Sequence, residues 1–208
     1  MLNQLKQDLS VALLEIGAVK FGEFRLKLHE KNPTAPLSPI YVDLRLLRSF
    51  PKAFHLAIAT YESLINGPRE DLLADIPTAA TPFVGALAYT LEWPMVSPRL
   101  GMKSHGTQQY IEGAYASGQS VLLIDDLITK AESKFDAIGV LEGGGLRVAR
   151  VVVLVDREQG GAAELSSRGY GFRAAMTLSE LLNFYRTHGL VTESDYSRTI
   201  AYLSTLAK

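Results

Sequence analysis

Two adjacent carboxylates and a hydroxyl follow a short apolar run in the middle of the chain. Val121 to Ile124 are apolar, and Asp125, Asp126 and Thr129 come after them. Such a run is typical of a strand buried on both faces, as in a parallel sheet. In these sheets ligands bind beyond the carboxyl ends of the strands, and the next helix offers N–H groups to an anion. The pattern predicts a binding crevice, although a surface strand-to-helix turn also explains aspartates here.

A second group of chemistry-bearing residues lies in a segment rich in glycine, serine and proline. Arg99, Lys103 and His105 fall within the stretch SPRLGMKSHGT. A segment of this composition is expected to be mobile, as lids over active sites are. Three cationic or protonatable side chains on a lid suit a reaction in which negative charge builds on a leaving group. On composition alone, a solvated basic loop is the simpler explanation.

Several stretches, taken in order along the chain, resemble the motifs of one enzyme family. IDDLIT resembles the phosphoribosyl-pyrophosphate (PRPP) motif of type I phosphoribosyltransferases. Phe21 to Arg45, Arg99 to Gly106 and Asp156 to Gly161 narrow the likeness to orotate phosphoribosyltransferase, especially the domain type found in UMP synthase. Four motifs in the right order are far more specific than any one of them.

The resemblance implies transfer of phosphoribosyl from PRPP to orotate, which gives orotidine 5′-monophosphate and pyrophosphate in pyrimidine nucleotide biosynthesis. The expected catalytic residues are Lys103, His105, Asp125 and Asp126. The aspartates would hold the ribose hydroxyls or the water shell of Mg²⁺, which would bind through PRPP and water without a direct protein ligand. No nucleophile is needed, because positioning and charge stabilisation do the work. The expected PRPP-binding residues are Lys27, Arg99, Lys103, His105, Asp125, Asp126, Thr129, Lys130, Ala131, Glu132 and Ser133.

The resemblance also implies a set of orotate-binding residues. Arg157 is assigned to the orotate carboxylate, because a guanidinium binds a carboxylate through two parallel hydrogen bonds. The backbone around Tyr41 and Val42 would lie against the orotate ring, and Thr129 completes the expected set. From the residues alone, Arg157 is equally explained by a surface ion pair with an acidic neighbour, and Tyr41 by a place in the core.

Three departures from the family pattern motivate other hypotheses. Leu100 stands where relatives have lysine, and Ala131 and Glu132 stand where they have glycine and a small hydroxyl residue. Alanine in a left-handed conformation costs about 1–2 kcal/mol, and a carboxylate about 4 Å from a phosphate costs about 4 kcal/mol at an effective dielectric of about 20. An outward-pointing Glu132, compensation by Lys130, or a ligand without that phosphate would each remove the repulsion. The alternatives are an impaired relative that binds a nucleotide or a partner and, given the lengthened loop 29–37, a transferase for another base.

The elements expected around these residues alternate between strands and helices. This order favours an α/β fold, with a mostly parallel sheet flanked by helices and a small N-terminal hood. We expect a single phosphoribosyltransferase-like domain over residues 1–208, with the hood mainly within 1–45. Thr177 and Glu180 have the spacing of a capping box. Strands are expected at 18–28, 38–43, 72–76, 94–96, 110–113, 121–124, 148–155 and 170–175, and helices at 2–16, 46–66, 83–91, 134–144, 178–188 and 193–206.

Composition restricts the partners and the compartment. The 208 residues carry a net charge of −1 and include no cysteine. The chain therefore has no basic field for nucleic acid or membranes, and the lack of thiols fits a reducing, cytoplasmic compartment. No apolar segment approaches the length of a membrane span. The resemblance implies a homodimer in which loop 97–107 crosses to the neighbouring subunit, and it leaves open an association with orotidine 5′-monophosphate decarboxylase.

Overall fold

A six-stranded sheet forms the centre of the computed structural model, which describes residues 2–25, 28–101 and 110–206. The strand order is β5-β4-β3-β6-β7-β8. The pairs from β4 to β8 are parallel, and β5 lies antiparallel to β4 at one edge. This architecture confirms the expected α/β fold with a mostly parallel sheet. The strands are β3 (Leu72–Asp75), β4 (Met95–Pro98), β5 (Ile111–Glu112), β6 (Ser120–Ile128), β7 (Arg147–Asp156) and β8 (Gly171–Thr177).

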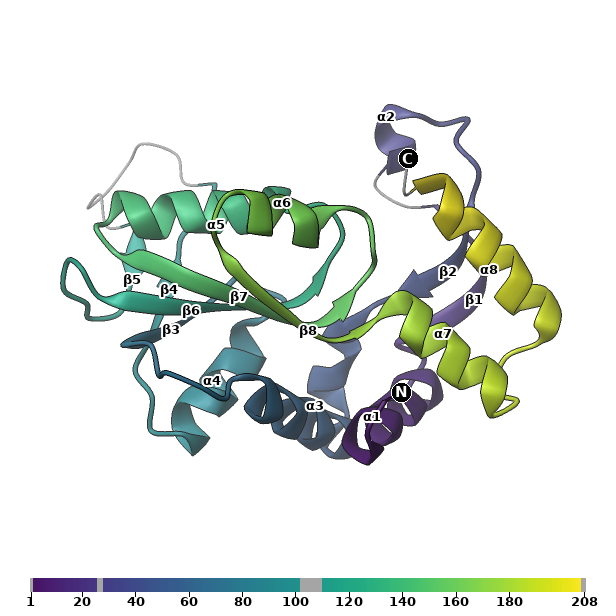
Figure 1. The fold of residues 1–208 in the computed structure, drawn as a ribbon, viewed down its shortest axis with the longest axis horizontal. Coiled ribbons are helices and arrows are strands. Elements are labelled where there is room, and N and C mark those ends of the chain that lie inside the picture. The colour runs from purple at the N-terminus through teal and green to yellow at the C-terminus, as the bar shows by residue number, and fades with distance from the viewer. Residues whose placement is uncertain (1, 26–27, 102–109, 207–208) are drawn as a thin grey trace.

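Helices cover both faces of this sheet (Figure 1). Successive side chains of a strand point to opposite faces. Leu122 and Ile124 accordingly pack in one apolar cluster with Tyr61 and Phe83, whereas Leu123 packs in a second cluster on the other face. The apolar run of β6 is therefore buried on both sides, as its sequence predicted. The first face is covered by α3 (Pro51–Leu64) and α4 (Thr81–Thr90), and the second by α5 (Glu132–Gly143) and α6 (Gly161–Ser167).

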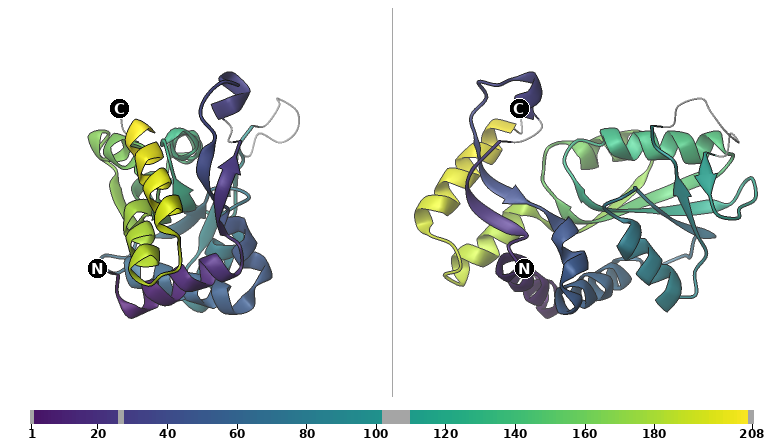
Figure 2. Two further views of the ribbon diagram at one scale, coloured as in Figure 1. Left: turned by 90° about the vertical axis from the view of Figure 1, so that its right-hand side faces the viewer. Right: turned by 180° about the vertical axis from the view of Figure 1, so that it is seen from behind.

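A smaller two-stranded sheet from the N-terminal part of the chain stands beside the main one, and helices from the C-terminal part pack near it (Figure 2). Arg198 donates a hydrogen bond to the Gly22 carbonyl at 3.2 Å, and the Tyr185 hydroxyl donates to the Ser10 carbonyl at 2.7 Å. The bounds of a hood within 1–45, and the single domain over 1–208, stay predictions. The elements here are α1 (Gln4–Glu15), the antiparallel strands β1 (Val19–Phe24) and β2 (Ser38–Val42), α7 (Leu178–Thr187) and α8 (Glu193–Leu206).

Three helical features differ from the sequence-based expectations, and one matches in detail. The helix expected over 46–66 is divided into a 3-10 helix, η1 (Leu44–Ser49), and α3, which begins at Pro51 because proline suits a first helical position. A four-residue helix, α2 (Leu28–Lys31), lies in the lengthened loop, and α6 was not expected. The capping box of Thr177 and Glu180 is present. Within the described residues, no helix is both long and apolar enough to cross a membrane.

Strand β6 extends beyond the apolar run that predicted it. The aspartates were expected where the strand ends, but the strand continues through them to Ile128. Asp125 is aligned with Val153 of β7, and Ile128 with Asp156. Since residues alternate along a strand, Asp125 faces α5 and Asp126 faces the opposite side of the sheet. The two carboxylates therefore lie in different surroundings.

Candidate active site

Asp125 is held by protein groups on both of its carboxylate oxygens. Its Oδ2 accepts a hydrogen bond from Lys134 Nζ at 2.5 Å, and its Oδ1 accepts from the backbone N–H of Asp126 at 2.9 Å. The side chains of Lys134 and Asp125 are 4% and 6% exposed. Sequence reasoning missed Lys134. The sequence does carry a signal for it, because a lysine stands where the apolar stripe of α5 begins. The stripe continues three, four and seven residues later with Ala137, Ile138 and Leu141.

Asp126 is also buried, but it accepts fewer hydrogen bonds from the described residues than Asp125 does. Its Oδ1 accepts the N–H of Leu127 at 2.7 Å, and within the described residues no group donates to its other oxygen. Burial, followed by the charge of Asp125, raises the pKa of Asp126 to about 7. Both carboxylate oxygens of Asp125 thus accept hydrogen bonds from the protein, whereas one oxygen of Asp126 is left to accept from a ligand.

At the turn from β6 into α5, backbone donors have no partners among the residues that the structure describes. Ala131 precedes the helix and has no side-chain oxygen to cap it, so the N–H groups of the first turn have no acceptor within the helix. Such a helix start binds anions. Ala131 has φ −86°, so the left-handed conformation expected for it is wrong and the associated cost does not arise. Glu132 and Ser133 are exposed at the first two helical positions.

Arg157 is a buried cation that has no anionic partner among the described residues. Its side chain follows β7, is 8% exposed, and leaves Nε and Nη2 without partners among the described residues. The neighbouring acids are occupied elsewhere: Asp156 accepts from the Glu158 N–H at 2.8 Å, and Glu158 accepts from the Ser179 N–H at 2.7 Å. The alternative of a surface ion pair is therefore wrong. Burial lowers the pKa of Arg157, and such a group calls for an anionic ligand.

Two tyrosines border Arg157. The hydroxyl of Tyr202, from α8, is buried without a partner in the described part of the chain. The ring of Tyr41 packs against the ring of Phe24, with centroids 5.5 Å apart and planes tilted by 31°. The hydroxyls of Tyr202 and Tyr41 both act electrostatically on Arg157 and partly offset the effect of burial on its pKa. Tyr202 carried no local sequence signal, because 45 residues separate it from Arg157.

The remaining expected residues lie at the margins of this site or outside the described residues. Arg99 forms an ion pair with Glu112, and its backbone N–H donates to the Tyr110 carbonyl at 2.8 Å. Val42 is buried in the core, which leaves its backbone as the part that a ligand could approach. Thr129 is half-buried and Lys130 exposed. Lys27, Lys103 and His105 lie outside the described residues.

The described side chains do not form a metal site by themselves. Among the described residues, no group of three histidine, cysteine, aspartate or glutamate side chains is arranged to hold an ion. Mg²⁺ often binds through one or two carboxylates together with substrate phosphates and water. The open oxygen of Asp126 fits that mode of binding.

Known structures place this fold in an enzyme class. No family model matches the chain. The structure of Leishmania donovani UMP synthase has a TM-score of 0.84 and 34% identity, and the match covers 96% of this chain and 42% of that chain. Solved orotate phosphoribosyltransferases share the fold. The architecture is that of a type I phosphoribosyltransferase.

Sequence relatives define the family within that class. An orotate phosphoribosyltransferase of Pyrobaculum aerophilum is 35% identical over 193 residues, which are 92% of this chain and 96% of the relative. The chain belongs to the orotate phosphoribosyltransferase family and is by that membership a glycosyltransferase. The bifunctional enzyme PyrF/PyrE of Nostoc sp. is 32% identical over 91% of this chain, which spans only 38% of that longer relative.

Proposed function

We propose that the chain transfers the phosphoribosyl group of PRPP to N1 of orotate. The N1–C1′ bond forms as the bond from C1′ to the pyrophosphate oxygen breaks, and the proton of N1 passes to the departing pyrophosphate or to water. The observation that carries the proposal is the buried Arg157, whose Nε and Nη2 have no partner among the described residues. The carboxylate on the orotate ring supplies the missing charge in a matching bidentate geometry. The buried hydroxyl of Tyr202 is a second donor for the same ligand, and the backbone at Tyr41 and Val42 borders the ring.

PRPP would occupy the turn between β6 and α5. The free N–H groups at the start of α5 would bind its 5′-phosphate, with Thr129, Lys130 and Ser133 around it. The open oxygen of Asp126 would accept a ribose hydroxyl. Asp125 would hold the backbone of that segment in place. In this arrangement catalysis is positioning plus charge stabilisation.

The leaving group would be served by groups on the other side of the ribose. When bound with PRPP, Mg²⁺ neutralises charge on the departing pyrophosphate. The open oxygen of Asp126 would contact its water shell. Arg99, Lys103, His105 and Lys27 would supply further positive charge or protons. Because Leu100 stands where relatives have lysine, this set has one cation fewer.

The assembly and compartment are also proposals. We propose a homodimer, in which loop 97–107 of one subunit closes over the site of the other, and a place in cytoplasmic pyrimidine biosynthesis. The UMP synthase and the bifunctional enzyme are longer than this chain. Their length supports an association of this chain with an orotidine 5′-monophosphate decarboxylase, by fusion or by contact.

The test is the loss of orotate absorbance when the protein is mixed with PRPP and Mg²⁺. Uracil, which lacks the ring carboxylate, and the purine bases serve as competing acceptors. We expect turnover of orotate, and little turnover of uracil because it leaves Arg157 unpaired. Turnover of another base in preference to orotate would support the hypothesis of a different acceptor. No turnover of any base, with PRPP still bound, would support the impaired relative.

A further inference from the structure

We propose that Lys134 is a positioning residue of the transfer site. It holds the residues on both sides of Asp126, through the side chain of Asp125 and the backbone carbonyl of Leu127, so that the open carboxylate oxygen of Asp126 is aimed at the ribose. The inference rests on the proposed function and adds to it a residue that touches neither substrate.

The contacts of Lys134 flank Asp126 on either side. Its ammonium donates to Oδ2 of Asp125 at 2.5 Å and to the carbonyl oxygen of Leu127 at 2.7 Å. These are the residues directly before and after Asp126. From the opposite face of the sheet, the Tyr61 hydroxyl donates to the Asp125 carbonyl at 2.7 Å. The segment that presents Asp126 is therefore clamped from both faces.

Stability alone does not account for a lysine at this position. Lys134 begins a stripe that continues with Ala137, Ile138 and Leu141, all buried against the sheet. An apolar residue would extend that stripe, and replacing a buried ion pair by packed apolar side chains is often neutral or stabilising. The charge is instead placed where it compensates Asp125. Without it, two aspartates would carry their charge next to the turn that receives the phosphates of PRPP.

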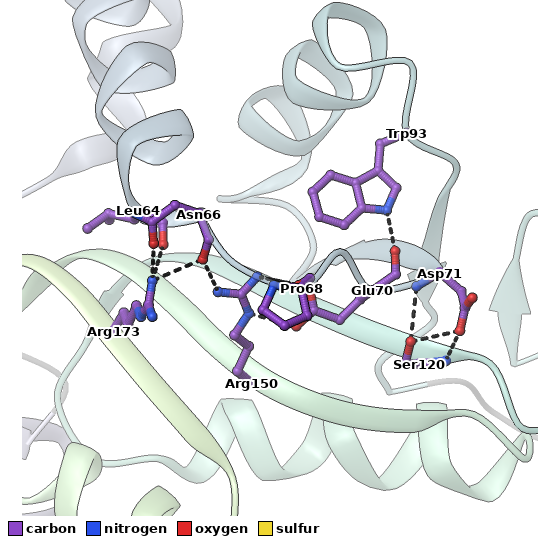
Figure 3. Close-up of polar contacts among 9 residues, drawn as sticks. All are labelled: Leu64, Asn66, Pro68, Glu70, Asp71, Trp93, Ser120, Arg150 and Arg173. Atoms are coloured by element: carbon purple, nitrogen blue, oxygen red, sulfur yellow. Dashed lines mark hydrogen bonds and ion pairs between the residues drawn. The ribbon is translucent and has the colours of Figure 1, made fainter.

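A comparable ion pair far from the site provides a matched control. Arg150 and Glu70 approach to 2.6 Å with side chains 12% and 9% exposed. They join the start of β7 to the segment before β3 (Figure 3). Because Asp126 lies near the carboxyl end of β6, which runs parallel to β7, the pair is at the opposite end of the strands. Breaking this pair should affect stability without reaching the PRPP site.

The experiment measures PRPP binding and steady-state kinetics for Lys134→Met, Lys134→Arg and Arg150→Met. We expect Lys134→Met to raise the Kd and KM for PRPP by about 10- to 100-fold, while the KM for orotate changes less than about threefold. Lys134→Arg should recover most of the PRPP affinity. Arg150→Met should lower the Tm without changing the KM for PRPP. Unchanged PRPP affinity in Lys134→Met, or an equal loss in Arg150→Met, would overturn the proposal.

A double variant covers the case in which Lys134→Met does not fold. Asp125→Asn with Lys134→Met removes both buried charges, so folding should be retained. We expect its PRPP affinity to stay at least about 10-fold below that of the unmodified protein, because the clamp is lost. Recovery of full affinity would contradict the positioning role. Direct PRPP binding needs no turnover, so a failure of orotate transfer in the unmodified protein would count against the proposed function and leave this test valid.

Discussion

The two ends of the central strands differ in how completely their polar groups are satisfied. At the amino ends, Arg150 donates to both carboxylate oxygens of Glu70 at 2.6 and 2.9 Å, and Asp71 accepts from the N–H and hydroxyl of Ser120 at 2.7 Å (Figure 3). The Trp93 N–H donates to the Glu70 carbonyl at 2.9 Å. These groups satisfy one another without a ligand.

At the carboxyl ends, several buried groups have no partner among the described residues. Arg157 leaves two nitrogens unpaired, Tyr202 leaves its hydroxyl, and Asp75 leaves one oxygen while the other accepts from the Thr81 hydroxyl. Buried polar groups without partners cost free energy. The comparison shows that polar groups are paired at one end of the sheet, whereas the other end leaves donors and acceptors that the proposed substrates would use.

The largest expected effect is at Arg157. Arg157→Met should lower kcat/KM for orotate by about 100- to 1,000-fold, because the ligand carboxylate would be buried without its cation. The Tm should be unchanged or raised, since Nε and Nη2 of Arg157 have no partner to lose among the described residues. Steady-state kinetics and thermal unfolding of the same preparation measure both. A large fall in Tm would contradict the contrast between the two ends.

Arg150→Met is the corresponding experiment at the amino ends of the strands, where the polar groups are paired. Removing one partner of this pair leaves Glu70 as an uncompensated carboxylate that is mostly buried. We expect the free energy of unfolding to fall by about 3 kcal/mol, with kcat/KM for orotate within about threefold of normal. Chemical denaturation measures the first quantity. Loss of activity in a variant that remains folded would show that the two ends are coupled.

The pH dependence of PRPP binding should follow Asp126. Its pKa is raised to about 7, first by burial and then by the charge of Asp125. Below that pH the carboxyl is protonated and accepts poorly from a ribose hydroxyl, so kcat/KM for PRPP should fall by about 10-fold for each pH unit below 7. The Asp126→Asn variant should show only the pH dependence of the substrate. Identical profiles in the two proteins would exclude Asp126 as the titrating group.

The same pKa shift predicts a change in stability with pH. An unfolded aspartate releases its proton near its ordinary pKa of about 3.9, whereas the folded protein holds the proton until about pH 7. Between these values the folded state binds more protons, so the free energy of unfolding should fall as pH rises through the window. Asp126→Asn should remove that slope. Denaturation curves from pH 4 to 8 provide the comparison.

A smaller effect is expected at Tyr202. Tyr202→Phe removes one hydroxyl that has no partner in the described part of the chain, so folding should be unaffected. The KM for orotate should rise by about three- to tenfold, which is the value of one hydrogen bond. The KM for PRPP should not change and serves as the internal control. A variant with unaltered orotate affinity would remove Tyr202 from the site.

The smallest effect is expected at Glu132. Its side chain is exposed at the start of α5, so water screens its charge. Glu132→Thr should improve the KM for PRPP by less than about threefold at moderate salt, with a larger gain at low salt. An improvement by three orders of magnitude would restore the repulsion argument and with it the hypothesis of an impaired enzyme.

Sequence reasoning predicted features that depend on local order, among them the buried strand that leads to the candidate site. The apolar run before Asp125 implied a buried strand, and the residue types after it implied an anion-binding turn. Arg157 was identified through its motif. The length of β6 was missed because Asp125 and Asp126 look like a strand end, whereas the parallel ladder with β7 continues through them. Helix α6 was missed because its seven residues carry too little periodicity.

The sequence by itself determined the fold class and the family, because alternating strand and helix patterns and four ordered motifs are properties of the linear chain. Only the tertiary structure decided which charged and polar side chains contact one another. It placed Lys134 against Asp125, left Asp126 open, and brought the hydroxyl of Tyr202 near Arg157. These relations depend on which faces of separate elements meet, and a side chain's local sequence does not specify its partner across a fold.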